Sequence, residues 1–183
     1  MIVISGCCCG GSSTSEQELK LEAMQEKADI ISDAGGIAAC ATANARNVDL
    51  ALDSATTRGR QALATLVNEQ LESLKSSFEK EIGRGKGAEF DILFNTANQT
   101  ILAKYIQGCI PKDIQCDTKS GATTAFAFMV LDPKIIPEAF NTQANTQRHL
   151  YTRFKASHAF EDLNKRVAKY QKWAKKDGAL LVN

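Results

Sequence analysis

Apolar and small residues recur at three- and four-residue steps between Asn47 and Ile82, and charged residues fill the positions between them. This pattern predicts one long amphipathic helix, which either Asn44 or Asn47 caps through its side-chain oxygen. Gly59 lies inside the helix, where glycine costs about 1 kcal/mol relative to alanine. Small residues around it would let the helix backbone lie close to the element that packs against it, and we expect that element to be a sheet. The small positions are Ala51, Ala55, Gly59 and Ala62.

Three shorter segments have the pattern of β-strands. Ile37–Ala43 is a run of small, mostly apolar residues, which suits a buried strand. Thr123–Leu131 carries aromatic residues at alternate positions, and a turn at Lys119–Gly121 joins it to an earlier strand segment, Cys109–Cys116, in a predicted hairpin. Pro111 lacks the N–H that a central ladder position needs, so we expect an edge or a bulge there.

Helical patterns flank the strands. Residues 88–105 and 151–176 are apolar on one side and polar on the other, which predicts a second and a final helix, with a short helical turn at 134–140. Residues 16–31 alternate charges with few apolar residues, as in a marginal helix or an extended linker. The expected class is α+β: a small sheet, made of one N-terminal strand plus a hairpin, packed against two or three helices, with an extended N-terminal tether and a C-terminal helix.

Composition fits one domain with tails. The chain has 183 residues with 44% hydrophobic content, enough to bury a core. A net charge of +1 argues against a nucleic-acid binder, and no apolar run approaches the roughly 20 residues that span a bilayer. We divide the chain into a start and tether or marginal helix (1–34), an α+β domain (35–140) and a basic C-terminal helix (141–183).

The first residues suggest a lipid anchor. The string Ile4-Ser5-Gly6-Cys7 has the form that lipoprotein signal peptidase recognises, which would make Cys7 a lipidated N-terminus. Small and polar residues at 10–15 then suit a tether. A secretory signal needs an apolar stretch of roughly 7–15 residues, and residues 1–4 supply only its end, so either the start is truncated or the motif is a coincidence. The adjacent Cys8 and Cys9 leave open a cluster of reactive or metal-binding thiols.

Further cysteines and histidines offer little chemistry. Cys109 and Cys116 either bridge across the Pro111 loop or stay free thiols in strands. Adjacent cysteines lack the two-to-four-residue spacing of zinc ligands, so we expect no metal site and no cofactor. His149 and His158 are nine residues apart, off one helical face, and the chain has no metalloprotease, serine-hydrolase or nucleotide-binding motif. We therefore expect no enzyme.

The C-terminal region is locally basic. Between Arg148 and Lys176, nine basic residues face two acidic ones. We expect an interaction surface for anionic lipid head groups, a cell-wall polymer or an acidic face of a neighbouring subunit such as residues 16–29. The alternative is a solvated helix face with Tyr170 and Trp173 packed inward. The surface residues are Arg153, Lys165, Arg166, Lys169 and Lys172.

The order of these elements resembles the LPP-twenty family of small bacterial outer-membrane lipoproteins, which includes a flagellar member. The resemblance covers roughly residues 35–140. It implies a periplasm-facing domain on a lipid anchor that builds envelope or flagellum-associated structures by self-association. The residues that carry it are Gly36–Ala39, Asn47, Ala51, Ala55, Arg58, Arg60, Leu63, the segments 108–114 and 121–132, and the string Ile4–Cys7.

These observations predict a structural, self-associating lipoprotein of the bacterial cell envelope, at the outer membrane or cell surface, that forms rings, tubes or filaments. We expect a homo-oligomer held to the membrane by its lipid, with no nucleic-acid partner and no small-molecule substrate. The alternative is a soluble secreted or periplasmic binding module that recognises a cell-wall or protein ligand through its basic helix. A thiol or metal enzyme is a third and weaker hypothesis.

Overall fold

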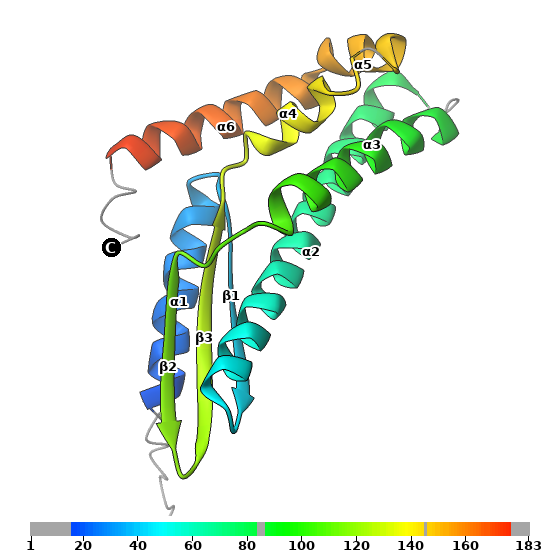
Figure 1. The fold of residues 1–183 in the computed structure, drawn as a ribbon. Helices are drawn as coiled ribbons and strands as arrows, with labels where there is room; N and C mark the ends of the chain where they lie inside the picture. The colour runs from blue at the N-terminus through cyan, green and yellow to red at the C-terminus, as the bar shows by residue number, and fades with distance from the viewer. Residues whose placement is uncertain (1–15, 84–86, 145, 177–183) are drawn as a thin grey trace, which may run out of the picture.

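The computed structural model describes residues 16–83, 87–144 and 146–176 and has the predicted α+β class, with helices on both faces of a small sheet (Figure 1). The strands are β1 (Ile37–Ala45), β2 (Asp113–Lys119) and β3 (Ala122–Leu131). The helices are α1 (Glu16–Asp33), α2 (Val48–Ile82), α3 (Gly87–Ile101), α4 (Ile135–Asn141), α5 (Arg148–Lys155) and α6 (His158–Lys176), and a π-helical turn, Leu102–Ile106, follows α3.

The sheet is antiparallel in the order β1-β3-β2, so β3 is its central strand. A two-residue turn joins β2 to β3, with positive φ angles at Ser120 (52°) and Gly121 (79°), as a type I′ hairpin turn requires. The predicted hairpin is therefore confirmed. Pro111 lies just before β2, which begins at Asp113 rather than Cys109 and forms an edge of the sheet, as the proline predicts.

Helix α2 lies close against one face of the sheet because its first turns carry small residues. Asn47 is its N-cap, and its side-chain oxygen accepts a hydrogen bond from the Leu50 N–H at 3.1 Å. At Gly59 an added Cβ would lie 2.7 Å from the Met129 Cγ on β3, so only glycine fits without displacement. The predicted sheet cover is confirmed. The small residues in this contact are Ala43, Ala51, Ala55, Ala125 and Ala127.

Helix α1 covers the opposite face, so residues 16–31 form a packed helix and not an extended linker. Met24, Ala28 and Ile31 are buried against Phe126 and Phe128 of β3. These three buried residues fall on one side of the helix, whereas two other apolar residues, Leu19 and Ile30, are exposed. The core thus extends across the predicted boundary at residue 34.

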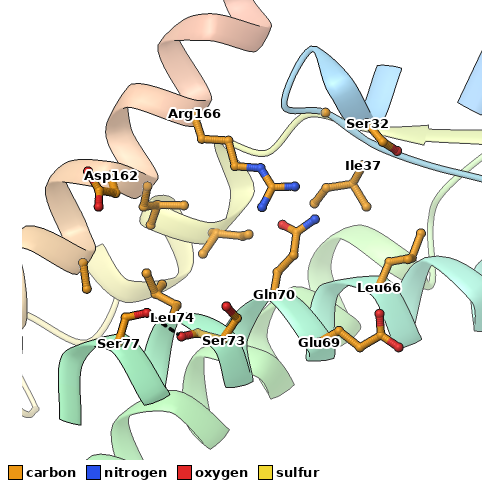
Figure 2. A pocket seen from close by; sticks show the side chains of 14 residues that line it. Ser32, Ile37, Leu66, Glu69, Gln70, Ser73, Leu74, Ser77, Asp162 and Arg166 are labelled. Carbon is orange, nitrogen blue, oxygen red and sulfur yellow. Dashed lines mark hydrogen bonds between the residues drawn. The ribbon is translucent and has the colours of Figure 1, made fainter. Parts of the chain in front are cut away.

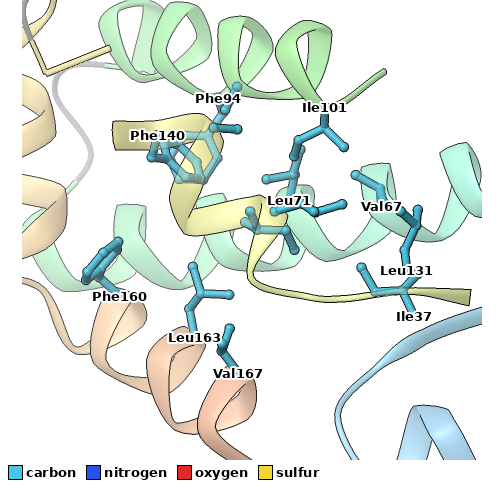
Figure 3. Close-up of a cluster of buried hydrophobic side chains, with 14 of the residues drawn as sticks. Ile37, Val67, Leu71, Phe94, Ile101, Leu131, Phe140, Phe160, Leu163 and Val167 are labelled. Carbon is cyan, nitrogen blue, oxygen red and sulfur yellow. The ribbon is translucent and has the colours of Figure 1, made fainter. Parts of the chain in front are cut away.

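Beyond the end of the sheet, the second half of α2 packs with α3 to α6 around a cluster of phenylalanines (Figure 3). The ring centroids of Phe78 and Phe90 lie 5.0 Å apart, and those of Phe140 and Phe154 lie 4.6 Å apart. Aromatic pairs at such distances contribute about 0.5–1.5 kcal/mol beyond their buried area. Phe140 and Phe154 lie on opposite sides of the predicted boundary at residue 140, which therefore falls inside the core.

The C-terminal segment forms two helices where the sequence predicts one. The chain turns at Ala156 and Ser157, between α5 and α6. The buried Ser157 hydroxyl donates to the Phe154 carbonyl at 2.6 Å and accepts from the Phe160 N–H at 3.2 Å, as a helix cap does. This turn places Phe154 and Phe160 in contact, with centroids 5.3 Å apart, which one continuous apolar pattern does not reveal.

We predict that Gly59→Leu lowers the free energy of unfolding by about 1–3 kcal/mol, because the new side chain overpacks the contact with Met129. Chemical denaturation measures the change. Ser76→Leu, at an exposed position of the same helix, is the control and should stay within about 0.5 kcal/mol of the parent. In the double variant with Met129→Ala, the loss should be smaller than the sum of the two single losses. Strict additivity would contradict the close contact.

Candidate functional site

A cavity of about 470 Å³ lies where α2, α4 and α6 meet the start of β1 (Figure 2). Its volume falls in the range of about 300–1,000 Å³ typical of small-molecule sites. Its apolar wall comes from all of these elements, and polar side chains from α1, α2 and α6 complete it. The apolar lining residues are Ile37, Leu66, Leu74, Ile136, Ala159 and Leu163.

Arg166 of α6 is the positive group of this pocket. Its Nε donates to the Gly35 carbonyl at 3.3 Å, and its guanidinium makes no ion pair within the described residues. The side chain is half-buried, and this burial lowers the pKa of the guanidinium. A cation withdrawn from water without a carboxylate beside it carries an uncompensated desolvation cost. The arrangement therefore favours an anionic group in the pocket.

Gln70 of α2 supplies a second polar group of the pocket. Its Oε1 atom is buried and accepts no hydrogen bond in the described part of the chain. Figure 2 shows Gln70 and Arg166 directed from α2 and α6 toward the space between them. Sequence reasoning did not find Gln70. The available signal is the polar series Gln70, Ser73 and Ser77, which runs at helical steps along α2 beside buried apolar residues.

Acidic residues border the same pocket. Glu69 of α2 and Asp162 of α6 are both exposed lining residues. Asp162 accepts from Lys165 at 3.2 Å, so part of its charge is already balanced. A ligand that fills the pocket would therefore meet one arginine inside and two carboxylates in more exposed positions. This distribution suits a ligand with one negative charge better than a ligand with several.

The five basic residues predicted as one interaction surface do not form one. Arg153 lies on α5, and Arg166 lines the pocket. Lys165, Lys169 and Lys172 share an exposed face of α6, because they are separated by steps of four and three residues. Sequence reasoning could not assign Arg166 correctly, because the face that a helix buries depends on what packs against it.

The structure shows the inward packing that the sequence offers as one description of α6, and the interaction surface stays a prediction. Tyr170 is buried and Trp173 is half-buried, with ring centroids 5.7 Å apart, so the aromatic side does pack inward. On the outer side, Lys165 is paired with Glu161 at 2.9 Å, and the Lys169 ammonium donates to the Asp33 carbonyl. Lys172 and Lys176 make no hydrogen bond or ion pair with any described residue.

Two exposed charge stripes of opposite sign lie on α1 and α6. The acidic stripe runs along the outer side of α1, opposite its buried residues, and the basic stripe runs along the outer side of α6. Each stripe has four charges separated by steps of four, three and four residues. The acidic stripe is Glu22, Glu26, Asp29 and Asp33, and the basic stripe is Lys165, Lys169, Lys172 and Lys176.

The two edges of the sheet differ in how open they are. The outer edge of β1 lies between α1 and α2, in a groove of about 370 Å³ that Ala38 and Cys40 help to line. Arg58 of α2 donates to the Thr42 carbonyl at 2.7 Å and so occupies a backbone acceptor of this edge. The β2 edge is largely exposed and carries charged residues, which discourage strand addition. Edge pairing between subunits is therefore restricted at β1 by α1, α2 and Arg58, and it is discouraged at β2 by the charged residues.

Three cysteines are free thiols within the described residues: Cys40, Cys109 and Cys116. The alternative of a bridge between Cys109 and Cys116 is thus not the arrangement in the structure. Cys109 is half-buried near the aromatic core, Cys116 is exposed on β2, and burial raises the pKa of the Cys40 and Cys109 thiols. Cys7, the predicted lipidation site, lies outside the described residues.

Comparisons with family models, curated proteins and solved structures found no match. The resemblance to the LPP-twenty family therefore stays a prediction. Among residues 16–83, 87–144 and 146–176, no cluster of histidine, cysteine and acidic side chains could hold a metal ion. In the same ranges no helix combines the length and apolar character needed to cross a bilayer.

We predict that Cys116 is alkylated faster than Cys40 and Cys109 in the native protein at neutral pH, because burial leaves less of the other two as reactive thiolate. A time course with iodoacetamide followed by peptide mapping measures the three rates. All three should become equally reactive after denaturation. A pair of peptides that contain Cys109 and Cys116, linked and lighter by two hydrogens without reduction, would contradict the free-thiol arrangement.

Proposed function

We propose that this chain is a structural subunit of the bacterial cell envelope that self-associates through the charge stripes of α1 and α6 and is held at the membrane by a lipid on Cys7. The observation that carries the proposal is the matched spacing of the two stripes. The role is contact between copies of the chain and not catalysis.

The stripes are not paired with each other inside one protomer. Figure 1 shows that α1 runs along the strands, whereas α6 crosses above the upper end of the sheet, so the axes of the two helices point in different directions. Within the protomer, the Lys169 ammonium reaches the end of α1 only at the Asp33 carbonyl. Glu22, Glu26 and Asp29 make no ion pair within the described residues. These carboxylates are therefore available to a second molecule.

The spacing brings opposite charges into register on two helices that lie side by side. Steps of four, three and four residues read the same in both directions, so parallel and antiparallel pairing align the charges equally well. Eleven residues of helix rise about 16 Å, which is the length of each stripe. A contact from α1 of one copy to α6 of the next uses two different surfaces. Repetition of such a contact produces rings or open filaments.

The contact should be weak in free solution. Exposed ion pairs contribute about 0–1 kcal/mol each, and physiological salt screens them over about 8 Å. A lipid anchor would confine copies to one surface and raise their effective concentration, as linkage does for other weak contacts. A weak contact between stripes is therefore compatible with the proposed anchor, because the anchor would favour assembly at the membrane over assembly in solution.

We predict that Lys172→Glu with Lys176→Glu abolishes self-association, and that Glu22→Lys with Glu26→Lys does the same, because each change places like charges opposite each other. An equimolar mixture of the two double variants should associate again, since each then offers the stripe that the other needs. Analytical ultracentrifugation at low salt measures all three samples. The assemblies of the parent and of the mixture should both dissociate as salt is added.

The matched control for the lysine variant is Lys80→Glu with Lys104→Glu, which changes the net charge by the same amount at exposed positions outside α1 and α6. It should assemble like the parent. A parent protein that stays monomeric at low salt and high concentration would refute stripe-driven self-association. If this monomer pelleted with cell-wall polymer and lost that binding on Lys172→Glu with Lys176→Glu, the basic helix would instead serve the alternative binding-module function.

We predict that protein isolated from its native host carries a diacylglyceryl group on Cys7 and partitions into the detergent phase. Intact mass and detergent partitioning measure the two properties. Cys7→Ser should lose the lipid mass and move to the aqueous phase, whereas Cys8→Ser should behave like the parent. An unlipidated parent protein would remove the anchor from the proposal and leave the charge-stripe contact to be judged by its own test.

A further inference from the structure

We propose that the pocket lined by Arg166 and Gln70 binds a small carboxylic acid that carries a hydrogen-bond donor beside its carboxylate, as 2-amino and 2-hydroxy acids with apolar side chains do. The sequence predicts no small-molecule ligand, so this site is a finding of the tertiary structure. It is independent of self-association, because Arg166 and Gln70 belong to neither charge stripe.

Arg166 is the group that recognises the carboxylate. Its Nε is already engaged by the Gly35 carbonyl, which fixes the side chain, and its two terminal nitrogens are left without a partner in the described residues. A guanidinium offers parallel N–H donors that match the two oxygens of a carboxylate. A carboxylate placed there would supply the counter-charge that this half-buried cation lacks.

Gln70 is the group that selects the donor. A buried acceptor without a hydrogen bond is costly, and the Gln70 Oε1 atom is such an acceptor. A ligand with only a carboxylate would satisfy Arg166 and leave this oxygen unpaired. A ligand with an amino or hydroxyl group next to the carboxylate would satisfy both groups. The pair of unmet requirements therefore defines the polar end of the ligand.

The remaining lining limits the rest of the ligand. Ile37, Leu66 and Leu163 offer apolar surface, which suits an aliphatic or aromatic side chain. Glu69 and Asp162 would repel a second negative charge and attract an ammonium group. A phosphate dianion fits this balance poorly, because one arginine would have to offset two charges close to two carboxylates. Among the two donor classes, the acidic residues favour the amino acid.

The binding test uses leucine and three probes that each differ from leucine by one group. Leucine carries a carboxylate and an amino group, 2-hydroxy-4-methylpentanoate carries a carboxylate and a hydroxyl, 4-methylpentanoate has no donor, and leucinamide has no carboxylate. Isothermal titration calorimetry with the parent protein measures their affinities. We expect leucine or the hydroxy acid to bind about tenfold or more tightly than the other two probes. The tighter of the two identifies the donor class.

Two variants connect the affinity to the named residues. Arg166→Met should weaken the tighter ligand about tenfold or more. Gln70→Met should reduce its affinity to that of 4-methylpentanoate and should leave the thermal unfolding temperature unchanged or raised, because an unpaired buried oxygen is removed. Gln61→Met, at an exposed position of the same helix, is the control and should change neither quantity.

Several outcomes would overturn the proposal. If none of the four probes binds the parent protein at millimolar concentration, the pocket is not a site for this class of ligand. Equal affinities for leucine and leucinamide would refute the role of Arg166, and equal affinities for the three acids would refute the role of Gln70. If Arg166→Met fails to fold, the Gln70→Met comparison still decides, because lower affinity with retained stability is not expected of a merely structural residue.

Discussion

The close approach of α2 to the central strand β3 is the contact on which the rest of the fold depends. Alanines face alanines across this interface, and Gly59 leaves room for Met129. Helix α2 is continuous over 35 residues, so it is about 52 Å long. The ten residues of β3 extend only about 33 Å. The helix therefore continues past the sheet, and the buried apolar residues of its second half need other elements to pack against.

These other elements explain the change in residue size along α2. Against the sheet its buried positions are small, whereas beyond it they are large, ending at Phe78. The helices α3 to α6 surround this large-residue half with further phenylalanines. The pocket lies between the half of α2 that packs on the sheet and the half that packs among helices, where the start of β1 meets α4 and α6. The small residues that pack on the sheet and the large residues that pack among the helices do not fill this junction completely. Polar side chains line the cavity that remains.

The sequence was sufficient where a local pattern determines the structure. The periodicity of α2 and the Ser120-Gly121 turn are set by neighbouring residues, and both were predicted; the cap at Asn47 was one of two predicted candidates, with Asn44 as the other. Helix α1 was uncertain because Met24, Ala28 and Ile31 are too few to define a face until the sheet is in place. The break at Ser157 was missed because both sides of it keep a helical period. Arg166 was assigned to the surface, since no local signal tells that its side chain bends toward Gly35.

Part of the basic bias of α6 has an internal cause. Helix α1 has no basic residue in its last turn, so nothing on α1 itself balances the negative end of its dipole. Lys169 and Arg166 of α6 supply positive charge there, at the carbonyls of Asp33 and Gly35. These two side chains join the end of α1 to α6, and they account for part of the charge excess without any partner. Lys172 and Lys176, one and two turns further along, have no such role within the described residues, and their side chains are exposed to solvent.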